Sequence, residues 1–95
     1  MAVQKRQRRK VGHSMQISVR YPGIIGDMLE RKGDAVTLPD GASVADLVQH
    51  LTGADDTAAS ILKQTRPFIN GQQADRASLL VDGAEVIFMR PIAGG

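Results

Sequence analysis

Two different hydrophobic periods in one short chain are the feature that most constrains its fold. Apolar residues alternate with polar residues from Met15 to Tyr21, which is the pattern of a strand with one buried face. From Val44 to Leu51, apolar residues recur at intervals of three and four, which is typical of an amphipathic helix. A chain of 95 residues has room for about one domain. We therefore expect an α+β fold in which one main helix packs across a small mixed sheet.

Turn and cap residues set the limits of the elements in the first half of the chain. Pro22-Gly23 ends the first strand, and one or two helical turns are expected before Gly33. A second strand is predicted at residues 35–38 and is expected to pair antiparallel with the first. Ser43 then begins a capping box with Asp46, which marks the start of the main helix.

Shorter elements follow in the second half. Residues 55–64 predict a weaker helix, and residues 67–69 predict a short strand that is followed by the turn dipeptide Asn70-Gly71. Further short strands are expected, with the apolar segment 77–81 leading into a turn. Residues 84–89 predict the last strand.

The last strand is apolar on both faces. Val86 and Phe88 fall on one face, and Ile87 and Met89 fall on the other. A strand of this kind is central in the sheet, and its second face is either covered or offered to a partner.

Composition excludes several classes of function. The chain has no Cys, so disulfides, thiolate metal sites and Cys nucleophiles are absent, and its two histidines, His13 and His50, are too isolated to suggest a metal site. No apolar run approaches the ~18 residues that would span a bilayer, so no membrane partner is expected. The common phosphate-binding, hydrolase and metalloprotease motifs are also missing. The chain is therefore expected not to be an enzyme.

Positive charge is concentrated at the N-terminus. Residues 1–14 contain five Lys or Arg residues and no acid, which leaves seven of the twelve cations against all ten acids in the rest of the chain. We predict a disordered basic arm at residues 1–14. It is interpreted as a solvated arm, with a nucleic-acid patch or a leader ahead of Met15 as alternatives. Nucleic acid is an improbable partner for the fold itself, because the fold is mildly acidic.

The sequence closes on an unusual segment, Arg90-Pro91-Ile92-Ala93-Gly94-Gly95. Pro91 should end the last strand, so residues 91–95 are predicted to form a flexible tail. Two glycines without Cβ atoms present the terminal carboxylate on a thin stalk that fits a narrow channel. Because a free carboxylate is a poor electrophile, a partner enzyme must activate it, for example by adenylation. The activated acyl group can then receive sulfur or pass to an amine.

At this point the sequence resembles a known family. The order of D-G-A-S-V-A-D-L at Asp40–Leu47, F-I-N-G at Phe68–Gly71, D-G-A-E-V at Asp82–Val86 and the final R-P-I-A-G-G is similar to that of the ubiquitin-like sulfur carriers. These are β-grasp proteins typified by the small subunit of molybdopterin synthase and by the thiamine-thiazole sulfur carrier. The resemblance covers Met15–Gly95 and implies a β-grasp domain over residues 15–90.

The resemblance also implies a function. Gly95, preceded by Gly94, would be adenylated by a ubiquitin-activating-like adenylyltransferase and sulfurtransferase that uses ATP, and would then become a thiocarboxylate. A large synthase subunit would receive the sulfur, and the carrier itself would be cytoplasmic and bind no cofactor. The residues implied as partner contacts are Ile87, Met89, Arg90, Pro91, Ile92 and Ala93.

Other interpretations remain open. Molybdopterin synthesis is favoured over the thiamine and cysteine routes. The same activated carboxylate could instead form isopeptide bonds with lysines, which would make the chain a protein modifier. A third alternative is a non-covalent binding module whose basic arm contacts nucleic acid.

Overall fold

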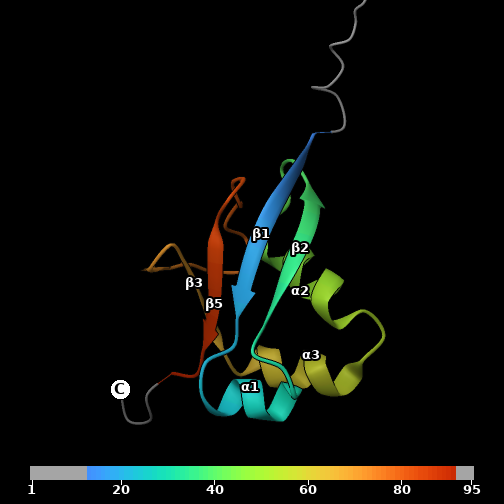
Figure 1. Cartoon of the computed structure of the whole chain (residues 1–95), viewed down its shortest axis with the longest axis vertical. Coiled ribbons are helices and arrows are strands. Elements are labelled where there is room, and N and C mark those ends of the chain that lie inside the picture. Colours follow the sequence, from blue (N-terminus) through green and yellow to red (C-terminus); the bar gives the residue numbers. More distant parts are fainter. Residues whose placement is uncertain (1–12, 92–95) are drawn as a thin grey trace, which may run out of the picture.

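Five strands and three helices make up the part of the chain that the computed structural model describes, residues 13–91 (Figure 1). In chain order the elements are β1 (Ser14–Arg20), α1 (Ile24–Leu29), β2 (Gly33–Pro39), α2 (Val44–Thr52), α3 (Asp56–Lys63), β3 (Arg66–Ile69), β4 (Gln72–Gln73) and β5 (Glu85–Met89). Within these residues no helix has the length and the apolar run needed to cross a membrane.

The strands form one mixed sheet in the order β2-β1-β5-β3-β4. The first and last strands of the chain, β1 and β5, lie side by side and parallel at the centre, and the other pairs are antiparallel. The predicted α+β class is therefore confirmed, including the antiparallel pairing of β1 with β2.

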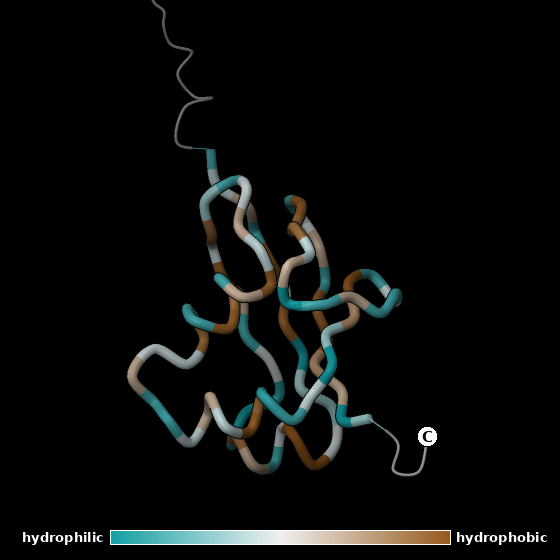
Figure 2. Tube along the Cα trace, turned by 180° about the vertical axis from the view of Figure 1, so that it is seen from behind, coloured by the Kyte–Doolittle hydropathy of each residue, from teal (hydrophilic) through white to brown (hydrophobic). Residues whose placement is uncertain are grey.

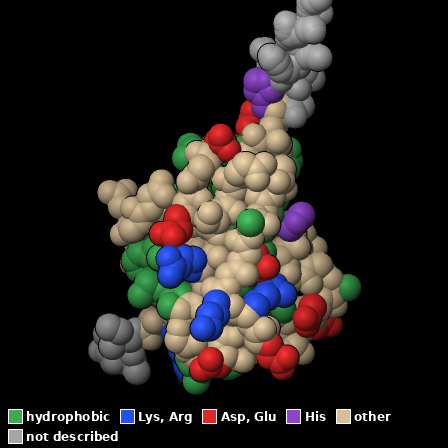
Figure 3. Space-filling view, viewed as in Figure 1, with side chains coloured by type: hydrophobic (Ala, Val, Ile, Leu, Met, Phe, Trp, Pro, Cys, Tyr) green, Lys and Arg blue, Asp and Glu red, His purple; other side chains and the backbone are tan. Residues whose placement is uncertain are grey.

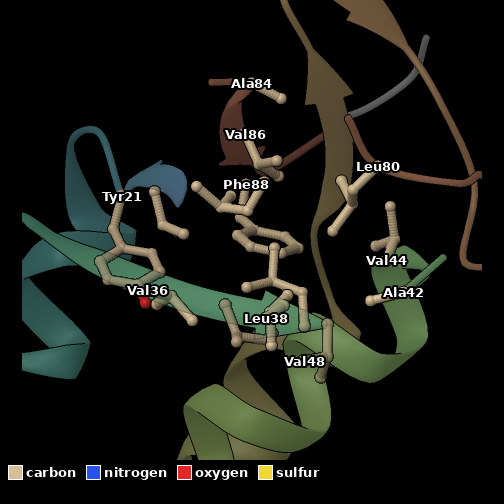
Figure 4. Close-up of a cluster of buried hydrophobic side chains, with 14 of the residues drawn as sticks. Tyr21, Val36, Leu38, Ala42, Val44, Val48, Leu80, Ala84, Val86 and Phe88 are labelled. Atoms are coloured by element: carbon tan, nitrogen blue, oxygen red, sulfur yellow. The ribbon is translucent and has the colours of Figure 1, made fainter. Parts of the chain in front are cut away.

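One face of the sheet carries the core. Met15, Ile17 and Val19 of β1 point inward and are almost fully buried, whereas the residues between them are exposed. This alternation of hydrophobic and hydrophilic residues is visible along the strands in Figure 2. The inward residues join buried side chains of all three helices in a single cluster, so the helices share this inner face. The Phe88 ring lies among the labelled core side chains in Figure 4.

Helix α2 begins where the sequence predicts. The Ser43 backbone N–H donates to Asp46 Oδ2 at 2.9 Å, and the Asp46 N–H donates to Ser43 Oγ at 3.3 Å, which completes the capping box. Gly53 forms the C-cap. His50 is exposed on the solvent side of the helix.

Several boundaries differ from the predictions. β1 begins at Ser14, inside the segment predicted as a disordered arm, because it pairs with β2 along its full length. The rest of that arm, residues 1–12, lies outside the described residues. Residues 77–81 form no strand; they contribute an isolated bridge between Leu79 and Ser43 and lead into the predicted turn at residues 82–83. Helices α1 and α3, predicted as short or weaker helical segments, add buried side chains to the same core as α2.

Candidate functional site

The last strand leaves the sheet beside the end of the first. Because β1 and β5 are parallel, their C-terminal ends meet at the same edge, with Arg20 opposite Ile87. Beyond β5, Arg90 and Pro91 are exposed and belong to no element. Figure 1 shows this exit next to the turn between β1 and α1. The remaining predicted site residues lie outside the described part of the chain: Ile92, Ala93, Gly94 and Gly95.

The two faces of β5 differ in the way that the sequence predicts. Val86 and Phe88 have no exposed surface, whereas Ile87 is half-buried and Met89 is 41% exposed on the opposite side. Phe68 of β3 lies directly opposite Ile87 and is also half-buried. These three side chains, Phe68, Ile87 and Met89, form what we call the outer patch.

Space-filling shows apolar side chains gathered over β5 and β3, close to the last described residues (Figure 3). Exposed apolar area of this kind, next to polar residues, is typical of an interaction surface.

Positive charge borders the outer patch. Arg20 lies opposite Ile87 and reaches Glu85 with Nη1 3.5 Å from Oε2, and Arg66 lies opposite Met89. Both arginines are exposed, so the ion pair between Arg20 and Glu85 is screened by solvent and adds little to stability. Their position favours a partner surface with an apolar centre and acidic residues at its margin.

The sequence pointed to Ile87 and Met89 but missed three neighbours, Phe68, Arg20 and Arg66. Alternation within β3 already places Phe68 and Arg66 on one face of their strand. Only the register of β3 against β5 shows that this face of β3 continues the outer face of β5. The position of Arg20 likewise depends on the parallel pairing of β1 with β5.

A buried tyrosine fixes the end of β1 at this site. Tyr21 is 2% exposed, and its ring stacks on Phe88 at 6.3 Å between centroids. Its hydroxyl donates to Asp34 Oδ2 at 2.8 Å, and Arg31 Nε lies 2.9 Å from the same oxygen. The Arg31 guanidinium also sits 5.7 Å from the Tyr21 ring centroid.

These contacts shift two pKa values upward. Burial, helped by the hydrogen bond to Asp34, raises the pKa of Tyr21 well above its usual value. The interaction with Tyr21 raises the pKa of Arg31. Tyr21 therefore remains a neutral donor at ordinary pH, and the cluster ties the start of β2 to the point where β5 leaves the sheet.

A depression of about 730 Å³ lies between the end of β1 and α1. Its lining includes charged side chains of both signs, Arg20, Asp27, Glu30, Arg31 and Lys32, together with Tyr21 and Pro22. Within residues 13–91, no group of three or more His, Asp or Glu side chains is placed to hold a metal ion. The described site thus combines the exposed outer patch with the end of β5, where the chain leaves the sheet.

A family model supplies the deciding comparison, since the ThiS family matches residues 19–95. The chain belongs to the ThiS family. The match begins within β1 and runs through the final glycines. It confirms the resemblance to the ubiquitin-like sulfur carriers. No curated protein sequence matches the chain with significance.

Solved structures show the same fold as this ThiS-family chain. HVO 2177 of Haloferax volcanii is 24% identical, with a TM-score of 0.70 over 86% of this chain and 88% of its own. SAMP1 of the same organism is 18% identical, with a TM-score of 0.71 over 84% of this chain and 99% of its own.

A third structure is the complex of subunits 1 and 2 of the molybdopterin-converting factor of Helicobacter pylori. The chain of that complex that matches is 18% identical to this chain. Its TM-score is 0.61, over 85% of this chain and 100% of its own. Together these similarities confirm the β-grasp, ubiquitin-like fold.

Proposed function

We propose that this chain is a sulfur carrier whose Gly95 carboxylate is adenylated and then converted to a thiocarboxylate. The observation that carries the proposal is the outer patch on β5, the strand that continues directly into R-P-I-A-G-G. The six residues after Met89 span at most about 20 Å when extended. A partner docked on the outer patch therefore has the terminal carboxylate within reach of an active site in the same protein.

The proposed chemistry takes place on the partner enzymes. A Gly95 carboxylate oxygen attacks the α-phosphorus of ATP and releases pyrophosphate, which leaves an acyl adenylate. Hydrosulfide from the sulfur donor then attacks the acyl carbon and displaces AMP, which leaves the thiocarboxylate. Gly94 and Gly95 have no Cβ atoms, so both pass through a narrow channel that excludes larger residues. In this scheme the chain is a substrate and binds no cofactor of its own.

The acceptor we favour is a molybdopterin precursor held by a large synthase subunit. The Helicobacter pylori structure is a complex of subunits 1 and 2 of a molybdopterin-converting factor, and its fold supports the same kind of pairing here. The contacts proposed for both partners are Ile87, Met89, Arg90, Pro91, Ile92 and Ala93, together with Phe68. Thiamine and cysteine synthesis are the alternative destinations of the sulfur.

The test is incubation of the full chain with an activating enzyme of this family, ATP and a sulfur donor, followed by intact-mass spectrometry. We expect the mass gain of one oxygen replaced by sulfur, located in the C-terminal peptide. A chain lacking Gly95 is the matched control and should show no gain. The proposal fails if an enzyme that charges its own carrier leaves this chain unchanged, or if the shortened chain gains sulfur as well.

A second candidate function is covalent protein modification. The similarity to SAMP1, a protein that a second Haloferax volcanii structure describes as a small archaeal modifier protein, favours it. The same activated Gly95 would then form an isopeptide bond with a lysine amine and release AMP. Higher-mass conjugates in cells that express the chain, lost when Gly95 is deleted, would support this function. Their absence under conditions that yield the thiocarboxylate would exclude it.

A further inference from the structure

The two edges of the sheet are protected to different degrees. Free strand edges pair with other chains, and natural proteins commonly shorten them or block them with proline, lysine or bulges. One edge is β4, which has only two residues. The other is β2, which has seven residues and, within residues 13–91, pairs only with β1. Its one proline, Pro39, is the last residue of the strand.

The hydrogen bonds that flank β2 show which of its groups face outward. The Asp40 N–H donates to the His13 carbonyl at 3.0 Å, and the Tyr21 N–H donates to the Lys32 carbonyl at 2.9 Å. In an antiparallel pair, hydrogen-bonded and non-hydrogen-bonded residue pairs alternate, so even-numbered residues of β2 bond to β1. The residues whose N–H and C=O groups point away from the sheet are Gly33, Ala35 and Thr37, and all three are exposed.

Charges at the two ends of β2 select one partner register. If two copies pair their β2 strands antiparallel with Val36 opposite its own counterpart, Lys32 of each copy lies opposite Asp40 of the other. A shift of the two-fold axis toward Ala35 instead places Glu30 opposite Asp40. A shift in the other direction places Asp34 opposite Asp40. Of these three registers, only the one centred on Val36 opposes unlike charges, and opposite charges stabilise cross-strand pairs whereas like charges destabilise them.

We propose that the β2 edge is a self-association surface, through which two copies of this chain join antiparallel about a two-fold axis at Val36. An isologous contact of this kind is self-complementary and closes at a dimer. The outer patch lies across β3 and β5, on the far side of β1, so both patches of the dimer stay open to other partners. The proposal does not depend on the sulfur-carrier function.

Analytical ultracentrifugation of the full chain over a wide range of concentrations, up to the millimolar, measures this association. We expect the mass to rise from 10.2 kDa toward twice that value. Thr37→Pro removes an outward N–H without breaking the ladder to β1, so this variant should stay monomeric. Thr37→Val keeps the N–H and is the matched control, expected to associate like the original chain. Circular dichroism verifies that both variants are folded.

A charge exchange tests the register even if the proline variant is unstable. Lys32→Glu and Asp40→Lys should each weaken the dimer, and the double variant should restore it. A chain that stays monomeric at millimolar concentration overturns the proposal. It is equally overturned if the folded Thr37→Pro variant associates as strongly as Thr37→Val, if the double variant does not recover, or if Met89→Glu abolishes association, because the outer patch would then be the contact.

Discussion

Replacement of Met89 by a charged residue gives the most direct measurement of the outer patch. Met89 lies on the outer face of β5, and its register partner on β3 is Arg66. In Met89→Glu the new carboxylate lies beside that arginine, so the folded protein should tolerate the change. The expected effect on the free energy of unfolding is within about 0.5 kcal/mol, as for most surface substitutions.

The cost to docking follows from the exposed area. Met89 exposes 41% of its surface. For a side chain of about 200 Å², this is about 80 Å², and its burial at ~25 cal/mol per Å² contributes about 2 kcal/mol. Loss of that contribution lowers affinity about 30-fold, since 1.4 kcal/mol corresponds to a factor of ten. Desolvation of the new carboxylate adds to this loss.

The assay is ATP–pyrophosphate exchange catalysed by the activating enzyme, measured against the concentration of this chain. Met89→Glu should raise the KM for the chain about 30-fold, whereas the midpoint of thermal unfolding stays unchanged. Leu79→Glu is the matched control, because Leu79 is 68% exposed and lies in the segment before β5 rather than on the outer patch. Equal KM values for the two variants would refute the assignment of the outer patch as the docking surface.

Two further predictions concern the structure that holds this site. Tyr21→Phe removes the 2.8 Å hydrogen bond to Asp34 but keeps the buried ring, so chemical denaturation should show a loss of about 1.5 kcal/mol; an unchanged midpoint would contradict the role of the hydroxyl. Gly26→Ala should destabilise by about 1–3 kcal/mol, because a Cβ at this position would clash with the Tyr21 carbonyl oxygen. Helix propensity alone predicts a gain of about 1 kcal/mol for this change, so a rise in stability would show that the backbone adjusts. Ala45→Gly on the exposed side of α2 measures that propensity separately.

Local signals in the sequence were sufficient for most elements. Alternation identified β1, because a strand with one buried face must repeat every two residues. The capping box at Ser43 located the start of α2, since both of its hydrogen bonds lie within one helical turn. The turn after residues 77–81 was likewise located by its own residues, Asp82 and Gly83.

Some features of the candidate site could likewise be predicted from the sequence, and others could not. The two faces of β5 were predicted correctly, since Val86 and Phe88 are buried and Met89 is exposed. Phe68 was missed because its contact with Ile87 joins residues far apart in the chain. The predicted roles of Gly94 and Gly95 stay predictions, because these residues lie outside the described part of the chain.

The sequence by itself determined the hydrophobic periods of the strands and helices and the capping of α2, because these depend on neighbours within a few positions. It also gives the identity of the final residues directly. Only the tertiary structure decided which strands are adjacent and in which register. That register places Phe68 beside Ile87, sets Arg20 and Arg66 at the rim of the outer patch, and leaves β2 as an open edge. Pairing of distant segments depends on burying the whole inner face at once, and no local stretch of sequence contains that information.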